Sequence, residues 1–280
     1  MSNEINRIGF IGLGSMGGAQ ARELAKLAIP LTVYDVSDAA MRMFEGRAKL
    51  AGSIGDLGEV SDVVGICVQD DAQVNDCIDQ LLPAMKPGST ILVHSTISPA
   101  TSKSVAAKTE ARGIKLLEAS VTRTEMTQDG PFVFCMIGGD EAEMARVQPV
   151  LDAYSTNTMY VGPIGSAMAL KISNNLVSWC EIMLGLECQK LATAAGVPIE
   201  KLLTVMNRNG VMSPPMAGFM AFARNPGDEK SRGLMAVQAG IGEKDLTLAE
   251  RLAIDAGVAA PITSYVRSLV KQAVLDVCES

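Results

Sequence analysis

The chain has 280 residues, of which 48% are hydrophobic and 20% are charged, a composition typical of globular proteins and unlike that of disordered ones. At roughly 150 residues per domain, this length predicts about two domains. A formal charge of −7 argues against nucleic acid as a partner, and an aromatic content of 4% leaves few side chains to stack on bases. One histidine and six scattered cysteines exclude a multi-histidine metal site and a zinc ribbon, so we predict no metal.

The sequence lacks the segments that direct a chain to a membrane or to export. The N-terminal letters MSNEINR run straight into an apolar stretch, without the charged region that precedes a cleavable hydrophobic segment. No uncharged apolar run reaches about 18 residues, the length of a membrane span. The cysteines mostly sit inside apolar patterns, as small buried side chains do in a reducing compartment. We therefore predict a cytoplasmic protein with no membrane partner.

Short β-branched runs alternate with helical patterns through the first half of the chain. The expected strands are Arg7–Ile11, Leu31–Tyr34, Val63–Val68, Thr90–Val93, Lys115–Ala119, Phe132–Ile137 and Thr158–Val161. The expected helices are Ala19–Leu27, Asp38–Phe44, Asp71–Leu82, Pro99–Arg112 and Glu141–Ala153. Such alternation implies a parallel sheet covered on both faces, and we predict an α/β fold with a Rossmann-type, doubly wound sheet.

The pattern changes near residue 162, where a Gly-Pro pair follows the last expected strand. Residues 165–195 contain no proline and no β run, which predicts one long helix that ends before the Gly-Val-Pro segment at 196–198. The rest of the chain has helical patterns, interrupted by a loop rich in Pro, Gly and Met that we expect over Asn207–Gly233. We therefore predict a sheet domain over residues 1–162 and an all-helical domain over residues 163–280.

A glycine-rich loop stands between the first expected strand and the first expected helix. The segment I-G-F-I-G-L-G-S-M-G contains the pattern G-x-G-x-x-G. The first glycine of this pattern makes a tight turn, the second lets the backbone approach a pyrophosphate, and the third lets the helix sit close to the strand. Backbone N–H groups and the positive end of the helix would hold the diphosphate. The expected dinucleotide contacts are Gly12, Leu13, Gly14, Ser15, Met16 and Gly17.

An acidic residue supports this interpretation over a glycine turn of purely structural origin. Asp35 ends the run L-T-V-Y-D, about 20 residues beyond the glycines, where a carboxylate accepts hydrogen bonds from the adenosine ribose. A carboxylate at this place repels a 2′-phosphate, and the Val-Ser that follows supplies no Arg to bind one. We therefore predict NAD rather than NADP as the cofactor.

A second motif stands at the start of the long expected helix, in G-S-A-M-A-L-K-I-S-N-N-L. Lys171 and Asn175 are one helical turn apart and share a helix face. A lysine on a mostly apolar helix either reaches a polar site or extends its stem along apolar neighbours to solvent. In the first case, its amine can exchange a proton with a hydroxyl or carbonyl group. Spacing alone leaves both readings open.

These segments, with two others, resemble the β-hydroxyacid dehydrogenase family, which includes 3-hydroxyisobutyrate dehydrogenases and tartronate semialdehyde reductases. G-F-I-G-L-G-S-M-G is nearly identical to the family's cofactor loop, and S-T-I-S-P at 95–99 is similar to its S-T-x-x-P segment. G-S-A-M-A-L-K-I-S-N-N resembles G-x-x-x-K-x-x-N-N, and K-D-L-T-L-A at 244–249 resembles K-D-L-x-L-A. The four segments occur in the family's order and span most of the chain.

The resemblance implies an NAD-dependent dehydrogenase or reductase of small hydroxy acids, with Lys171 as catalytic acid–base and Asn175 fixing the substrate. It implies that Thr96, Lys244 and Val68 lie at the cofactor, and that Asp245 orients Lys244. The implied partners are a small anionic substrate and further copies of the chain. A homodimer or homotetramer through the second domain also agrees with the apolar long helix.

The chain departs from the family in one motif. Where the family reads D-A-P-V-S-G-G, residues 118–124 read E-A-S-V-T-R-T, so Thr122 replaces a serine and Arg123 and Thr124 replace paired glycines. We expect these three residues to contact the substrate. The guanidinium of Arg123 can bind the substrate carboxylate in place of backbone donors. Alternatively, it turns away and the altered loop accepts a different substrate, or it is simply a solvated side chain.

Other readings stay open at this point. An imine reductase on the same scaffold or an inactive NAD-binding regulator would keep the same cofactor loop. A decarboxylase of the 6-phosphogluconate type fits less well, because no His stands beside Lys171. We interpret His94, the sole histidine, as structural. The apolar segment Ser213–Phe222 either covers the substrate or forms a packing loop.

Overall fold

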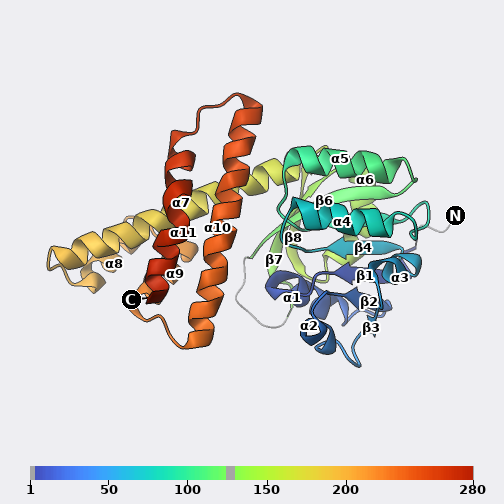
Figure 1. Cartoon of the computed structure of the whole chain (residues 1–280), viewed down its shortest axis with the longest axis horizontal. Coiled ribbons are helices and arrows are strands. Elements are labelled where there is room, and N and C mark those ends of the chain that lie inside the picture. Colours follow the sequence, from blue (N-terminus) through green and yellow to red (C-terminus); the bar gives the residue numbers. More distant parts are fainter. Residues whose placement is uncertain (1–3, 124–129, 280) are drawn as a thin grey trace. The chain divides into compact units, whose positions relative to one another are not determined.

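The computed structural model describes residues 4–123 and 130–279, and the chain divides into two compact units, Met1–Lys171 and Ile172–Ser280. In the described part of the first unit, eight strands form one sheet in the order β3-β2-β1-β4-β5-β6-β7-β8 (Figure 1). The strands are β1 Ile8–Ile11, β2 Leu31–Tyr34, β3 Lys49–Leu50, β4 Val63–Ile66, β5 Thr90–Val93, β6 Lys115–Arg123, β7 Val133–Gly138 and β8 Ser155–Gly162.

Strand order and direction confirm the doubly wound fold. Strands β1 to β6 are mutually parallel, and the order reverses between β1 and β4, the position where open α/β sheets bind ligands. The sheet departs from the expected parallel arrangement at one point, because β6 and β7 pair antiparallel. Residues 124–132 between these strands are too few for the crossover helix that a parallel connection needs. Strand β8 then pairs parallel to β7.

Helices cover both faces of the sheet. They are α1 Ser15–Leu24, α2 Asp38–Arg42, α3 Ile54–Glu59, α4 Asp71–Leu81, α5 Pro99–Glu110 and α6 Glu141–Leu151. Side chains of α1 and α6 pack in one buried cluster, whereas those of α3, α4 and α5 pack in another. Most of these helices begin at a side-chain cap, such as Asp70 before α4 and Ser98 before α5, which satisfies a backbone N–H of the first turn.

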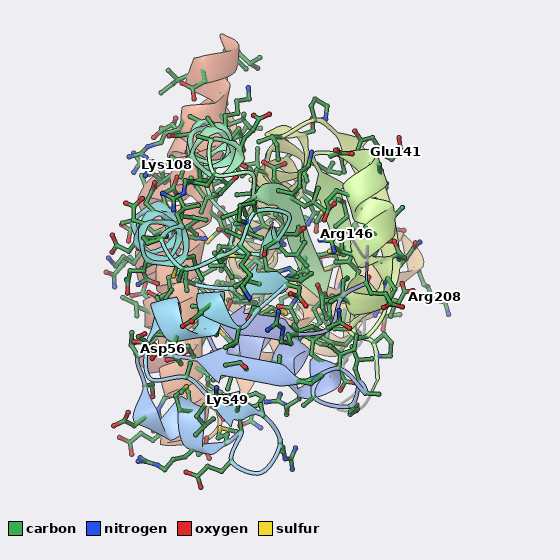
Figure 2. The ribbon with its side chains drawn as sticks, turned by 90° about the vertical axis from the view of Figure 1, so that its right-hand side faces the viewer. Lys49, Asp56, Lys108, Glu141, Arg146 and Arg208 are labelled. Atoms are coloured by element: carbon green, nitrogen blue, oxygen red, sulfur yellow. The ribbon has the colours of Figure 1, made fainter. Side chains whose placement is uncertain are left out.

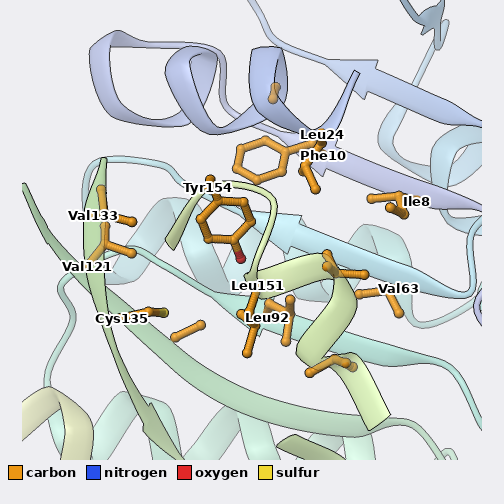
Figure 3. Packing of buried hydrophobic residues seen from close by; sticks show 14 of the residues in the cluster. Ile8, Phe10, Leu24, Val63, Leu92, Val121, Val133, Cys135, Leu151 and Tyr154 are labelled. Carbon is orange, nitrogen blue, oxygen red and sulfur yellow. The ribbon is translucent and has the colours of Figure 1, made fainter. Parts of the chain in front are cut away.

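The first cluster has aromatic rings at its centre. Phe10, Leu24 and Tyr154 lie next to one another there, and all three are essentially inaccessible to solvent (Figure 3). The ring of His94 stacks on Phe10, with centroids 5.7 Å apart, and meets Tyr154 edge-on at 5.5 Å. Its Nδ1 lies 2.7 Å from the carbonyl oxygen of Ala119 and therefore donates, which leaves Nε2 to accept from the Tyr154 hydroxyl at 3.4 Å. His94 is thus held as a neutral ring inside the core, as a structural role requires.

Charged side chains lie mainly at the periphery of this unit. Lys49, Asp56, Lys108 and Glu141 project outward around its rim, whereas Arg146 lies closer to the sheet (Figure 2). Arg146 pairs with Glu143 on α6, and both side chains hydrogen-bond Thr90 at the start of β5. The pair therefore ties α6 to the sheet.

The second unit is helical in its described part. Its helices are the remainder of α7 Ser166–Ala194, then α8 Ile199–Arg208, α9 Pro214–Arg224, α10 Glu229–Ala256 and α11 Pro261–Glu279. Helices α10 and α11 lie side by side (Figure 1), and their apolar residues enclose Trp179 of α7. The long helix expected over residues 165–195 is confirmed as α7.

The loop expected over Asn207–Gly233 is wrong for most of its length. Helix α9 begins at Pro214, and α10 already begins at Glu229. Two prolines are compatible with the first turn of a helix, where the missing N–H groups would have no partner. Ser213 caps this turn by accepting from the Met216 N–H. Phe219 and Phe222 pack against the helical core and Phe219 meets Trp179 edge-on, so this segment does pack but is not a loop.

Strand β6 also extends further than expected, because pairing with β7 continues to Arg123.

Among the described residues, no helix is both long and apolar enough to cross a lipid bilayer.

The burial of His94 predicts a loss of stability in acid. Burial lowers the pKa of its imidazole from the ordinary value of 6.5 to about 4. The fold therefore favours the neutral ring, so this stabilisation is complete above pH 6.5 and is lost as the pH falls from 6.5 towards 4. We expect the loss to reach about 3 kcal/mol in the free energy of unfolding.

Urea unfolding between about pH 7 and about pH 4.5 measures this loss in the free energy of unfolding. The matched variant is His94→Asn, whose amide N–H can still face the Ala119 carbonyl but does not titrate. The variant should lose less stability over this range than the parent protein. Equal losses in the two proteins would show that His94 is not the titrating group.

Candidate functional site

The three glycines of the first loop have three different environments. Gly12 follows β1 with φ +90°, and a Cβ there would lie 2.2 Å from the carbonyl oxygen of Cys67. Gly17 lies inside α1, where a Cβ would lie 2.1 Å from the carbonyl oxygen of Gly12. Gly14 is exposed, and a Cβ there would meet nothing within 4 Å. Gly12 and Gly17 thus serve the turn and the close helix–strand packing, whereas Gly14 leaves open space above the backbone.

This open space lies at the start of α1. Gly14 is the N-cap residue of α1, and Ser15 beside it is exposed while Met16 is half-buried. The first turn of α1 contains no acidic side chain, so no side chain of the helix itself neutralises its positive end. Exposed backbone N–H groups at a helix start suit a diphosphate, and the residues present therefore fit the expected cofactor.

Asp35 joins the glycine loop to the end of β2. Its Oδ2 accepts from the Leu13 N–H at 2.6 Å, and its Oδ1 accepts from the Ser37 N–H at 2.8 Å. A pocket of about 390 Å³ opens beside this carboxylate. Its lining consists of Tyr34, Asp35, Val36, Asp38, Met41, Arg42, Leu50, Ala51 and Gly52. Its position at the carboxyl end of β2, next to the glycine loop, suits an adenosine.

Two further loops meet at the reversal of strand order. Cys67 follows β4, and its N–H bonds the carbonyl of Ile11 at the end of β1. The next residue, Val68, donates its N–H at 2.8 Å to the Oγ of Ser95, which follows β5. Half-buried Thr96 comes next. Parallel pairing therefore brings Val68 and the Ser-Thr pair to the same edge of the sheet as the glycine loop.

Residues 118–123 of the altered motif lie on strand β6. Thr122 pairs with Phe134 and Arg123 with Val133 in the antiparallel ladder. The exposed guanidinium of Arg123 stacks over the buried ring of Phe132, with Cζ 5.4 Å from the centroid. A stacked guanidinium keeps its N–H edge available for an anion. Thr124, the third expected substrate contact, lies outside the described residues.

Lys171 is buried on α7, with an exposed fraction of 9%. This value does not fit a solvated surface lysine, the second reading of the sequence. A buried ammonium or amine is costly without polar partners, so such a lysine is rarely incidental. Asn175 follows one turn later on the same helix and is half-buried.

In the second unit, one carboxylate connects two expected site residues, Asn175 and Lys244, with Trp179. Asp245 of α10 is 4% exposed, and its Oδ2 accepts from Asn175 Nδ2 at 2.8 Å and from Trp179 Nε1 at 3.4 Å. Its Oδ1 lies 3.1 Å from Lys244 Nζ. The expected pairing of Asp245 with Lys244 is present. Its hydrogen bond to Asn175 was not anticipated, because sequence spacing does not relate α7 to α10.

Sequence reasoning missed Arg42 and Phe132. Arg42 lies on the same pocket as Asp35 although only Val-Ser follows Asp35 in sequence. Arg42 is seven residues beyond Asp35, in α2, the helix that follows β2. A helix in this place starts at the carboxyl end of the strand, where Asp35 also lies, and this is the signal that could have identified Arg42. Phe132 has no such signal, because its contact with Arg123 depends on the antiparallel register of β7.

Comparisons with known proteins agree with this geometry. The family model described as the NAD binding domain of 6-phosphogluconate dehydrogenase matches residues 7–162. An uncharacterized oxidoreductase of Mycobacterium tuberculosis is 31% identical over 268 residues, which cover 92% of this chain and 90% of that protein. Mitochondrial 3-hydroxyisobutyrate dehydrogenase of Rattus norvegicus is 31% identical over 205 residues, which cover 71% of this chain and 61% of the rat protein.

Solved structures share the fold over nearly the whole chain. A 3-hydroxyisobutyrate dehydrogenase from Salmonella typhimurium has a TM-score of 0.81 and 25% identity, covering 98% of this chain and 99% of that chain. An imine reductase from Myxococcus stipitatus in complex with NAD+ has a TM-score of 0.67 and 17% identity, covering 98% and 99% of the two chains. The second likeness bears on the fold alone.

Because Gly14 and Gly12 have different environments, we expect alanine at Gly14 to weaken NAD binding and alanine at Gly12 to lower stability. Gly14→Ala should fold like the parent protein, because φ −63° suits alanine and the added Cβ meets no neighbour. It should weaken NAD binding at least about tenfold, because the methyl group occupies the space that a pyrophosphate needs. Calorimetric titration with NAD and a thermal melt of the same sample give the two readouts.

Gly12→Ala is the contrasting variant. Its Cβ would clash with the Cys67 backbone at a positive φ, so it should lower the melting temperature. If Gly14→Ala binds NAD as tightly as the parent protein does, the diphosphate does not lie at this loop.

Proposed function

We propose a function from one premise: the chain belongs to the β-hydroxyacid dehydrogenase family and is an NAD-binding oxidoreductase that acts on CH–OH groups. We propose that its substrate is a small hydroxy acid or a related anion, and that Lys171 is the general acid–base. The observation that carries this proposal is the burial of Lys171 on α7, one turn before Asn175. The family resemblance of the K-I-S-N-N segment gives this lysine its role.

In the proposed reaction, the bound nicotinamide supplies the hydride acceptor, or the donor in reverse. Lys171 in its neutral form takes the proton of the substrate hydroxyl as the carbonyl forms, and its ammonium returns the proton in the reductive direction. The rest of the chain holds the reacting groups and excludes water.

Asn175 is proposed to position the substrate, and its neighbours suggest how. A carboxylate only accepts hydrogen bonds, so the bond with Asp245 fixes Nδ2 as the amide atom that faces α10. The carbonyl Oδ1 is then the atom left for a ligand. An acceptor suits the hydroxyl of a substrate better than its carboxylate, so we assign Asn175 to the reacting end of the molecule.

Arg123 is proposed to bind the anionic end, together with Thr122. Stacking on Phe132 restricts the guanidinium without using its N–H groups. A planar fork of this kind matches the two oxygens of a carboxylate. It would replace the backbone donors that paired glycines provide in the family, which accounts for the departure of this motif.

Lys244 is proposed to lie near the cofactor, as the family resemblance implies, with its direction set by Asp245. Val68 and Thr96 are proposed as cofactor contacts from the loops after β4 and β5. Together with the glycine loop after β1 and Asp35 after β2, these assignments place cofactor contacts after four parallel strands, which is where doubly wound sheets bind dinucleotides.

A homodimer or homotetramer through the second unit is also part of the proposal. Helix α7 exposes Val177, Leu184 and Leu191, which recur every seven residues and so share one face. Helix α11 similarly exposes Ile262, Tyr265 and Leu269. Repeated exposed apolar side chains on neighbouring turns are typical of surfaces that another subunit covers.

Two substitutions divide the proposed chemistry from the proposed binding. Lys171→Ala should lower kcat by roughly 10² to 10⁴, the usual contribution of general acid–base catalysis. Arg123→Ala should instead raise KM for the anionic substrate by roughly tenfold or more, because a charge-assisted pair is lost. NADH formation is measured with small hydroxy acids, β-hydroxy amino acids and hydroxysulfonates, in both enantiomers where they exist.

NAD affinity and the melting temperature of both variants are the controls, and both should stay close to the parent values. An unchanged kcat in Lys171→Ala contradicts the acid–base role, and an unchanged KM in Arg123→Ala contradicts the anion site. Oxidation of cyclic amines with no turnover of any hydroxy acid would instead support the imine reductase alternative.

The carboxylate of Asp35 is proposed to select NAD. The parent protein should prefer NAD over NADP by at least about tenfold in kcat/KM, because the carboxylate repels a 2′-phosphate. Asp35→Asn keeps the size of the side chain and should reduce this preference at least about tenfold. Arg42→Ala, in the same pocket, should weaken NADP turnover and leave NAD turnover nearly unchanged. A parent protein that prefers NADP tenfold would overturn the assignment.

A further inference from the structure

A buried carboxylate joins strand β6 to the start of α7. Glu118 is inaccessible to solvent, and within the described part of the chain it accepts hydrogen bonds from four uncharged donors. Its Oε1 accepts from Ser102 Oγ at 2.5 Å and from the Gly165 N–H at 2.8 Å. Its Oε2 accepts from the N–H groups of Ala167 at 3.0 Å and Met168 at 3.4 Å.

Three of these donors are backbone N–H groups at the beginning of α7. A helix leaves its first N–H groups without intrahelical partners, and a capping residue usually supplies the acceptor from the chain just before the helix. Here the acceptor comes from a distant strand. The direction of the first turn of α7 is therefore set by the sheet, and not only by the local chain.

The surroundings of Glu118 are shaped for this contact. A Cβ on Gly138, in the neighbouring strand β7, would lie 2.3 Å from Glu118 Oε2. Gly165 has φ +101°, a conformation that L side chains rarely adopt, and it brings its N–H to the carboxylate. Ser120, two residues beyond Glu118 on β6, also contacts α7, with its Oγ 3.2 Å from Met168 Sδ. The strand thus holds the first turn of α7 at two points.

The energy of the contact depends on charge. The pKa of Glu118 is raised, because burial outweighs the hydrogen bonds from Ser102 and the α7 backbone, which lower it. The positive end of a helix interacts favourably with a carboxylate, and a partly buried geometry strengthens the effect. A neutral amide of the same size would put an NH₂ group against backbone donors and leave at least one of them without an acceptor.

Lys171 lies one turn beyond Ala167 on the same helix. We propose that Glu118 is a positioning residue for the reaction, which fixes the start of α7 so that the amine of Lys171 stands at a constant place. This inference rests on the proposed role of Lys171 as acid–base. Because proton transfer depends on sub-ångström placement, loosening this turn should lower kcat more than it lowers cofactor binding.

The test compares Glu118→Gln with a matched control, Glu143→Gln. Glu143 is also a largely buried acid of the sheet unit, but it fixes α6 through Arg146 and Thr90. Glu118→Gln should lower kcat about 10- to 100-fold with KM for NAD changed less than about twofold. Glu143→Gln should keep kcat within about twofold of the parent value even if it melts earlier. Glu118→Asp, which keeps the charge, should recover at least about threefold of the lost kcat.

Hydrogen exchange provides a readout that does not depend on activity. The amides of Gly165, Ala167 and Met168 should exchange at least about tenfold faster in Glu118→Gln, and at the parent rate in Glu143→Gln. If Glu118→Gln does not fold, Glu118→Asp serves the same comparison, with a smaller gain in exchange and a smaller loss of kcat.

The outcomes separate this inference from the function on which it rests. Faster exchange together with the loss of kcat, both specific to Glu118, supports the positioning role. Faster exchange with parent kcat overturns it, as does an equal loss of kcat in Glu143→Gln. Unchanged kcat in Lys171→Ala marks a failure of the proposed function itself, and the positioning role then falls with it.

Discussion

The carboxylate of Glu118 is the contact through which the sheet controls the helix that carries Lys171. Strand β6 is held on both sides, because it lies between β5 and β7 and pairs with each of them. A helix of the length of α7, in contrast, can bend or shift at its start unless its first N–H groups are fixed. Capping from a strand transfers the rigidity of the sheet to the first turn. A local cap would satisfy the same donors but would leave the direction of the helix free.

The glycine loop shows why part of the site could be read from the sequence. Gly12, Gly14 and Gly17 lie within a few residues of one another, and their roles follow from backbone geometry that only this spacing permits. Asp35 could be placed for the same reason, since parallel strands β1 and β2 end at one edge of the sheet. The long helix was also predictable, because no proline or β run interrupts it.

Other features depended on pairings between distant segments. The direction of β7 is set by the short connection after Arg123 and by pairing with β6, and neither hydrophobic periodicity nor composition reports strand direction. The stacking of Arg123 on Phe132 follows from that pairing. Asp245 reaches Asn175 because α7 and α10 pack together. The sequence does not distinguish the helix that begins at Pro214 from a loop, because two prolines indicate a loop as readily as a first helical turn.

The pocket beside Asp35 shows how charge limits what a motif can predict. Asp35 and Arg42 line one pocket with opposite charges, and the glycine pattern is equally compatible with either cofactor. The carboxylate is the more restrained of the two, because Leu13 and Ser37 each donate an N–H to it, whereas Arg42 is exposed. In the proposed binding mode, the restrained carboxylate lies beside the ribose whichever cofactor is bound, whereas the exposed guanidinium has to move in to meet a 2′-phosphate. The proposed preference for NAD over NADP therefore depends on the carboxylate of Asp35, which is already held in place before the cofactor binds. The same reasoning applies to Arg123, which is proposed as an anion site because stacking on Phe132 holds its guanidinium in place.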